Sequence, residues 1–405
     1  MFLDTVLRRN PALVEAAAAL HGSGAIPPDT YVLDLDAVEA NAAVLAAGAR
    51  RHGLALWCVT KQFGRNPELI RAVARHLPAF AAIDPAEARA LRAAGVRAGN
   101  LGHLVQIPRR ALPELLAWRP EAVTVFDLDN ARAVSDAARA LGFVQDVLVR
   151  LEAAEGTGFP GQEGGVAPEG LEECAGRLER LPGIRIAGVT AFPCVVCDTA
   201  SGVPRPTANL ARAVAARGAL AARGHAGLKL SAPGATSVAA LPLLAANGAT
   251  HGEPGHALTG TTPLHAVDGR QPERPAYVYV SEVAHTLADG RPAVYGGGFY
   301  PRAVIRGALL PRTGARLAVE DAPPGNIDYY RLLAAPAAGS ARAGDTVVLA
   351  FRTQMFVTRS RVAVVAGLSG GSARLVGQYD ALGRAYGKGP GRHDGRGPSS
   401  SRATS

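Results

Sequence analysis

The chain has 405 residues, of which 48% are hydrophobic and 19% charged, a balance typical of a globular protein of one or two domains. Its net charge of +9 does not indicate a nucleic-acid-binding protein, because the arginines are scattered among carboxylates and about half of the excess lies in the C-terminal tail. There is no run of 18 apolar residues and no signal-peptide core, so we expect a cytoplasmic protein without a membrane span.

Residues 1–29 mix short apolar stretches with charges, which predicts an amphipathic N-terminal helical arm. From residue 30 to about 270, short apolar runs alternate with helix-length segments. Asp36 is placed to cap the helix after the first run, and Asp84-Pro85 to open the helix after the third. The expected strands are Tyr31–Leu35, Leu54–Thr60, Ala79–Ile83, Ala98–Leu101, Ala122–Phe126, Asp146–Leu151, Ile184–Ala191 and Leu228–Leu230.

A (β/α)₈ barrel and an open doubly wound sheet both follow this alternation. Eight units in about 235 residues match the size of a barrel, and no G-x-G-x-x-G motif follows the first run. We therefore predict an α/β fold in which residues 30–270 form a TIM barrel.

The pattern changes after Pro272, where short β-type runs lie between Gly, Pro and Asp turns. It predicts a C-terminal all-β domain over residues 271–388, followed by a disordered tail over 389–405, which is rich in Gly, Pro, Ser and Arg. The expected strands of this domain are Ala276–Val283, Ala293–Tyr295, Ala303–Leu310, Thr346–Ala350, Met355–Val357 and Arg361–Ala366.

Lysine is rare in this chain: Lys61, Lys229 and Lys388 stand against forty arginines. Lys61 ends the second predicted strand and precedes a turn, so its amine should lie at the mouth of a parallel sheet. Partial loss of solvent favours the neutral amine, which attacks carbonyl groups to form a Schiff base. The alternative is a lysine whose head group reaches into water.

A second cluster follows the eighth predicted strand and begins a helix. Small residues with hydroxyls at a helix start favour phosphate binding, although Thr236 or Ser237 could instead be a simple N-cap. A lysine and a phosphate cradle on one barrel face together imply pyridoxal 5′-phosphate. Glu253 is the candidate partner of its ring nitrogen, unless it is a surface residue of a Pro-Gly turn. The cradle residues are Ser231, Gly234, Ala235, Thr236 and Ser237.

Several motifs resemble those of alanine racemase-type (fold type III) pyridoxal-phosphate enzymes, and most of all their YhfX-type subgroup. The resemblance covers about residues 30–370. The matching segments are Tyr31–Asp36 with Asn41, Val59–Lys61, Ser231–Ser237, Glu253–Gly255 and Val294–Arg302.

This resemblance implies a pyridoxal-phosphate-dependent amino-acid racemase with two catalytic bases. Lys61 would serve one face of a small amino-acid substrate, and Tyr295 of a second subunit would serve the other face. A head-to-tail homodimer with two shared sites is therefore implied. Tyr300 would contact the phosphate or the substrate, and Arg352 would hold the substrate carboxylate.

The chain also departs from the pattern of those racemases. Gln162 stands where they carry an arginine that holds the cofactor oxygen, and it becomes a candidate substrate contact. Ala191 matches a histidine beside the cofactor ring, and Glu253 replaces an arginine at the ring nitrogen. The Glu-Pro-Gly motif resembles that of basic-amino-acid decarboxylases, so decarboxylation or another Cα-carbanion reaction stays open. However, relatives that decarboxylate commonly use a cysteine in the β domain, and none lies there.

Two further alternatives concern binding rather than turnover. Single-domain relatives of the barrel hold pyridoxal phosphate without catalysis, but they lack a β domain. Cys194 and Cys197 form a lone C-x-x-C with no second pair or nearby histidine, so we expect ordinary thiols and no metal site.

Overall fold

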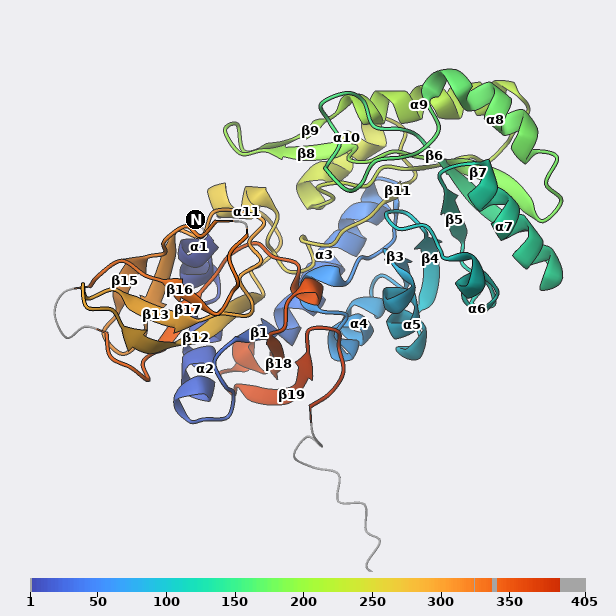
Figure 1. Ribbon diagram of the computed structural model, residues 1–405. Coiled ribbons are helices and arrows are strands. Elements are labelled where there is room, and N and C mark those ends of the chain that lie inside the picture. The colour runs from blue at the N-terminus through green and yellow to red at the C-terminus, as the bar shows by residue number, and fades with distance from the viewer. Residues whose placement is uncertain (1, 324, 337–340, 387–405) are drawn as a thin grey trace, which may run out of the picture.

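The computed structural model describes residues 2–323, 325–336 and 341–386. Figure 1 shows two lobes: a barrel with surrounding helices, and a lobe built mainly of β-strands from the C-terminal part of the chain. The predicted tail over 389–405 lies outside the described residues. Within the described ranges, no helix has the length and apolar character that a membrane crossing requires.

Eight parallel strands form the barrel, which confirms the predicted fold class. They are β2 (Ala55–Leu56), β3 (Ala79–Ala82), β4 (Arg97–Leu101), β5 (Ala122–Val125), β6 (Gln145–Arg150), β7 (Ile184–Thr190), β10 (Lys229–Ser231) and β11 (His251–Gly252). Their order is β2-β11-β10-β7-β6-β5-β4-β3, and a parallel bridge between Cys58 and Phe80 closes the gap between the two end strands.

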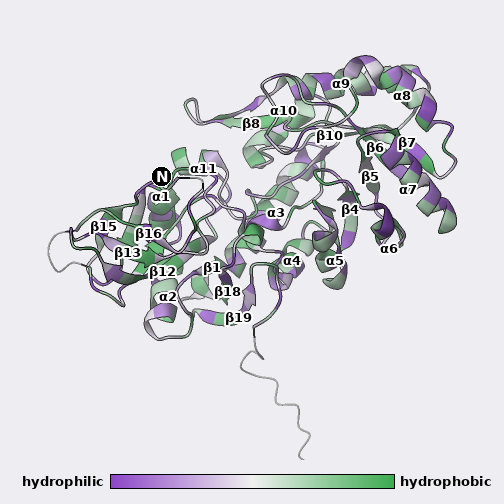
Figure 2. Ribbon diagram, viewed as in Figure 1, coloured by the Kyte–Doolittle hydropathy of each residue, from purple (hydrophilic) through white to green (hydrophobic). Residues whose placement is uncertain are grey.

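Helices follow most barrel strands and cover the outside. They are α3 (Leu35–Arg51), α4 (Pro67–Ala74), α5 (Pro85–Ala93), α6 (Leu112–Leu116), α7 (Leu128–Ala140), α8 (Leu171–Leu178), α9 (Ala208–Ala222) and α10 (Leu241–Ala246). A short helix after the barrel, α11 (Pro263–Val267), instead contacts the N-terminal helix of the chain. Figure 2 shows hydrophilic and hydrophobic segments alternating along α7, α8 and α9, as expected for helices with one buried face. Asp84 caps α5 by accepting a hydrogen bond from the Glu87 amide, as predicted.

The first expected barrel strand belongs to the other lobe, so this part of the prediction is wrong. β1 (Thr30–Asp34) lies between β12 (Tyr277–Thr286) and β18 (Arg361–Ala366). All five of its residues are buried, because one face packs on the N-terminal helices and the other on the main core. A short apolar run of this kind fits both the barrel and the sheet of the second lobe. Only its pairing with other strands decides to which of the two it belongs. The eighth barrel strand is instead β11, which has no apolar run to reveal it.

The residue that caps α3 is Asp34 and not the predicted Asp36, because the preceding strand ends earlier than expected. β1 ends at Asp34, and the Asp34 side chain accepts the Ala37 amide at 3.1 Å. The predicted cap, Asp36, instead accepts the Gly367 amide at 2.7 Å from the other lobe.

The second lobe contains a nine-stranded sheet that includes β1, β12 and β18. Its other strands are β13 (Pro292–Tyr295), β14 (Gly307–Leu310), β15 (Ala315–Ala318), β16 (Tyr330–Leu332), β17 (Thr346–Leu349) and β19 (Arg374–Asp380). The expected strand Met355–Val357 is wrong, because this segment forms a 3₁₀ turn, η5. The all-β domain otherwise has the predicted character.

The N-terminal arm is two helices, α1 (Phe2–Arg9) and α2 (Pro11–Gly22), which pack on a face of this sheet (Figure 1). Phe2 and Leu13 contribute to one buried cluster with Val32 and Val280. Pro11 begins the second helix, where a missing amide hydrogen is tolerated.

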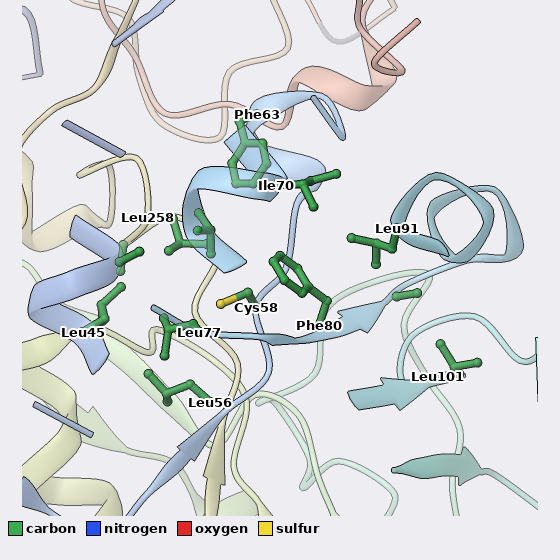
Figure 3. Close-up of a cluster of buried hydrophobic side chains, with 14 of the residues drawn as sticks. Leu45, Leu56, Cys58, Phe63, Ile70, Leu77, Phe80, Leu91, Leu101 and Leu258 are labelled. Atoms are coloured by element: carbon green, nitrogen blue, oxygen red, sulfur yellow. The ribbon is translucent and has the colours of Figure 1, made fainter. Parts of the chain in front are cut away.

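A dense apolar core supports the barrel where β2 ends. Figure 3 shows side chains from β2, β3, β4 and the following helices packed around Cys58. Phe63, Ile70 and Phe80 are fully buried there. Because such packing leaves little room for movement, it fixes the chain on both sides of Lys61.

Candidate active site

A cavity of about 270 Å³ opens where the carboxyl ends of the barrel strands meet the second lobe. Active groups of such barrels lie at this end of the strands. Six residues proposed from the sequence line this cavity: Lys61, Gly234, Ala235, Thr236, Glu253 and Arg352.

Lys61 follows β2 as the first residue of a 3₁₀ turn, η1 (Lys61–Phe63). The preceding Thr60 is held by the buried Glu87 carboxylate, which accepts its hydroxyl at 2.5 Å and its amide at 3.3 Å. Burial lowers the pKa of the Lys61 amine, although Glu87 and Glu253 oppose this shift. The geometry thus favours a neutral amine at the cavity wall, as the Schiff-base interpretation requires.

Glu253 follows β11 and is only 5% exposed, so it is not a surface residue of a turn. Its Oε1 accepts hydrogen bonds from Asn100 Nδ2 and Ser231 Oγ, both at 3.2 Å. Its amide donates to Thr236 Oγ1 at 3.2 Å, which ties the carboxylate to the proposed phosphate loop. Burial raises the pKa of Glu253 to about 7, so its charge state responds to small changes in surroundings.

The proposed phosphate loop joins β10 to a 3₁₀ turn, η4 (Val238–Ala240). Ser237 occupies the cap position, but its hydroxyl makes no capping bond and, among the described residues, has no partner. The Val238 amide is already bonded to Glu273 at 2.8 Å. A Cβ on Gly234 would lie 2.3 Å from the Val195 carbonyl oxygen, so only glycine allows this close approach. The Ala235 amide donates to the same oxygen at 2.9 Å, and Ala235 lines the cavity.

Five residues proposed from the sequence do not line this cavity. Two of them, Ser231 and Ser237, belong to the loop already described, and the other three lie elsewhere. Tyr295 ends β13, is 39% exposed, and its ring contacts Tyr330 at 5.7 Å between centroids. Tyr300 is 41% exposed. Gln162 is half-buried, and its carbonyl oxygen accepts a hydrogen bond from Arg150.

Sequence reasoning missed three residues of this region. His103 and His256 line the cavity. The buried Arg150 donates to the carbonyls of His103, Gln162 and Gly164 at 2.7, 2.7 and 3.2 Å. His103 and Arg150 lie at or just after strand ends, so the rule that located Lys61 could have found them. His256 directly follows the Glu253–Gly255 motif.

The two cysteines lie near this region but differ in setting. Cys194 is buried and donates to the Ala191 carbonyl, and burial raises its pKa to about 12. Cys197 lines the cavity on a hairpin of β8 (Val195–Asp198) and β9 (Val203–Pro206), which the sequence did not reveal.

The residues of the cavity fit pyridoxal 5′-phosphate. Several of their buried polar atoms have no hydrogen-bond partner among the described residues, although such atoms are normally paired. They are both ring nitrogens of His103, Nε2 of His256, Oε1 of Gln62 and Nε of Arg352. A polar ligand would satisfy these atoms, and the amine and carboxyl that this cofactor needs are both present.

Comparisons with known proteins agree with the two-lobed fold. Residues 33–263 match the family model described as alanine racemase, N-terminal domain, and residues 278–375 match the YhfX-like, C-terminal domain. The uncharacterized protein YhfX of Escherichia coli K12 is 43% identical over 394 residues, covering 96% of this chain and 100% of that one.

Two solved structures share the fold. D-threonine aldolase from Filomicrobium marinum has a TM-score of 0.67 at 19% identity, over 89% of this chain and 96% of its own. Alanine racemase from Clostridium difficile 630, in complex with cycloserine, has a TM-score of 0.61 at 16% identity, over 87% and 98%. The chain belongs to the alanine racemase-fold family, in its YhfX-like branch.

Proposed function

We propose that the protein is a pyridoxal-phosphate-dependent amino-acid racemase. The observation that carries this proposal is one cavity that is lined together by Lys61, Glu253 and the Gly234–Thr236 loop. The family match and the fold neighbours support the cofactor. The aldolase among those neighbours shows that the fold hosts more than one reaction, so the reaction must be argued from the site.

When bound, the cofactor supplies an electron sink that stabilises negative charge on the Cα of an amino acid. Lys61 would hold it covalently and then move the Cα proton on one face, because burial lowers its pKa and so favours the neutral amine. Glu253 would accept the ring N–H. Ser231, Ser237 and the Gly234–Thr236 loop would hold the phosphate, with Tyr300 as a further contact.

Arg352 would hold the substrate carboxylate. It lines the cavity, its Nη1 donates to the Arg302 carbonyl at 3.2 Å, and among the described residues it has no carboxylate partner. Its fork of N–H groups suits a carboxylate. Gln162 remains a weaker candidate because it lies outside the cavity lining.

Tyr295 would supply the second base to the site of another subunit. Tyr295 is exposed and does not line the cavity of its own chain, so it could act only on the site of a second subunit. A head-to-tail homodimer with shared sites is therefore part of the proposal. Co-expressing Lys61→Ala and Tyr295→Phe chains tests this arrangement. Mixed dimers hold one intact site, so activity should return to about a quarter of the wild-type value. Two inactive parents whose mixture stays inactive would exclude shared sites.

The reaction is tested by screening amino acids for deuterium uptake at Cα in deuterated water. Racemisation predicts exchange with the carboxyl group retained and with loss of optical purity. Release of carbon dioxide would overturn the racemase in favour of a decarboxylase. A cofactor spectrum without exchange for any amino acid would indicate a non-catalytic binding protein.

A further inference from the structure

The two oxygens of the Glu253 carboxylate have different surroundings. Both hydrogen bonds to the carboxylate, from Asn100 and Ser231, reach Oε1. Among the described residues, Oε2 accepts no hydrogen bond, and its nearest cationic or imidazole nitrogen is His103 Nε2 at 3.9 Å. That distance is longer than a hydrogen bond by about 1 Å.

His103 is held firmly beside this oxygen. Its carbonyl oxygen accepts Arg150 Nη1 at 2.7 Å, and its ring meets Phe192 edge-on at 5.6 Å between centroids. The side chain is only 3% exposed, and neither ring nitrogen has a hydrogen-bond partner among the described residues. A neutral imidazole always carries one N–H, so the structure leaves one buried donor unused.

We infer that His103 is a positioning residue for Glu253, donating Nε2–H to Oε2 when the cavity is filled. This inference rests on the proposed function, since it concerns how Glu253 meets the cofactor ring. Catalytic hydrogen bonds are often long in empty sites and tighten when a ligand binds. The bond would hold Glu253 as a carboxylate with Oε2 directed into the cavity.

The charged and titratable neighbours agree with this direction of the bond. Burial, followed by the nearby Arg150 and Lys61, lowers the pKa of His103 well below its usual range, so the ring is a neutral donor. Around Glu253 lie Lys61 and Arg150, which favour its charged form, and the buried thiol of Cys194.

The test is the dissociation constant of the full-length protein for pyridoxal 5′-phosphate, measured across pH. Wild-type affinity should rise as Glu253 ionises, and Glu253→Gln should abolish that rise. The lower midpoint of the rise reports the pKa of Glu253 in the loaded protein, which is the state in which the bond forms. His103→Leu removes the donor and should raise this midpoint by about one pH unit, because the carboxylate of the loaded protein loses a hydrogen bond. His103→Gln, whose amide can donate, should restore the wild-type midpoint.

The matched control is His251→Gln. His251 is also a buried histidine of this barrel, but its ring packs on Trp57 and it does not line the cavity, so the midpoint should not move. An unchanged midpoint in a folded His103→Leu protein would overturn the inference and leave the proposed function standing. A wild-type protein that binds no cofactor at any pH would overturn both.

Discussion

Replacing Glu253 by Gln should make the protein more stable and less active. Burial raises the pKa of Glu253 from 4.5 to about 7, so folding favours the neutral acid. This contribution to stability is fully present below pH 4.5 and is lost as the pH rises through 7. The shift corresponds to about 3 kcal/mol. Gln keeps the shape and can still accept from Asn100 and Ser231, but it never ionises.

The free energies of unfolding of cofactor-free wild type and Glu253→Gln should therefore be similar near pH 4.5 and separate by up to about 3 kcal/mol at pH 8. Urea titrations at the two pH values measure this difference. The same variant should lose about ten- to a hundred-fold in kcat/KM, the worth of a charge-assisted hydrogen bond. A stability difference that does not grow with pH would refute the reasoning about burial.

Three further substitutions test other parts of the structure. Arg150→Met should cost about 3 kcal/mol in urea unfolding because it leaves buried carbonyls unpaired, whereas the exposed Arg132→Met should cost nearly nothing. Arg352→Gln should raise KM for the amino acid without changing the cofactor absorbance, and an unchanged KM would remove Arg352 from substrate binding. Gly99→Ala should lower the unfolding free energy by about 1–3 kcal/mol, since the new Cβ would lie 2.2 Å from the Trp57 ring; equal stability would contradict the packing.

The barrel could be predicted because its strands and helices alternate in clear apolar periods. The sequence did not predict that β1 belongs to the second lobe and that β11 takes its place in the barrel. The reason is that β1 and the barrel strands are alike in being buried on both faces. β11 is only His251–Gly252, and its identity depends on pairing with β10 and β2 rather than on its own residues. Local periodicity does not encode such pairings.

Part of the candidate site could be predicted from local sequence, because active groups of such barrels lie just after the strands. Lys61 and the loop after β10 stand at strand ends, and the structure brings both to one cavity. The proximity of His103 to Glu253 could not be predicted, because these residues follow two different strands, β4 and β11, and are 150 positions apart. Tyr295 remains a prediction, since its place in a site depends on a second subunit.

The most direct test of the account asks which amine holds the cofactor. Borohydride reduction of the protein with pyridoxal phosphate, followed by peptide mass spectrometry, should place the added mass on Lys61. Lys229 is the natural control, because its amine lies 3.7 Å from Asp146 and it does not line the cavity. Full labelling that disappears in Lys61→Ala and survives in Lys229→Ala is the expected result. Labelling of Lys229, or none at all, would contradict the central claim.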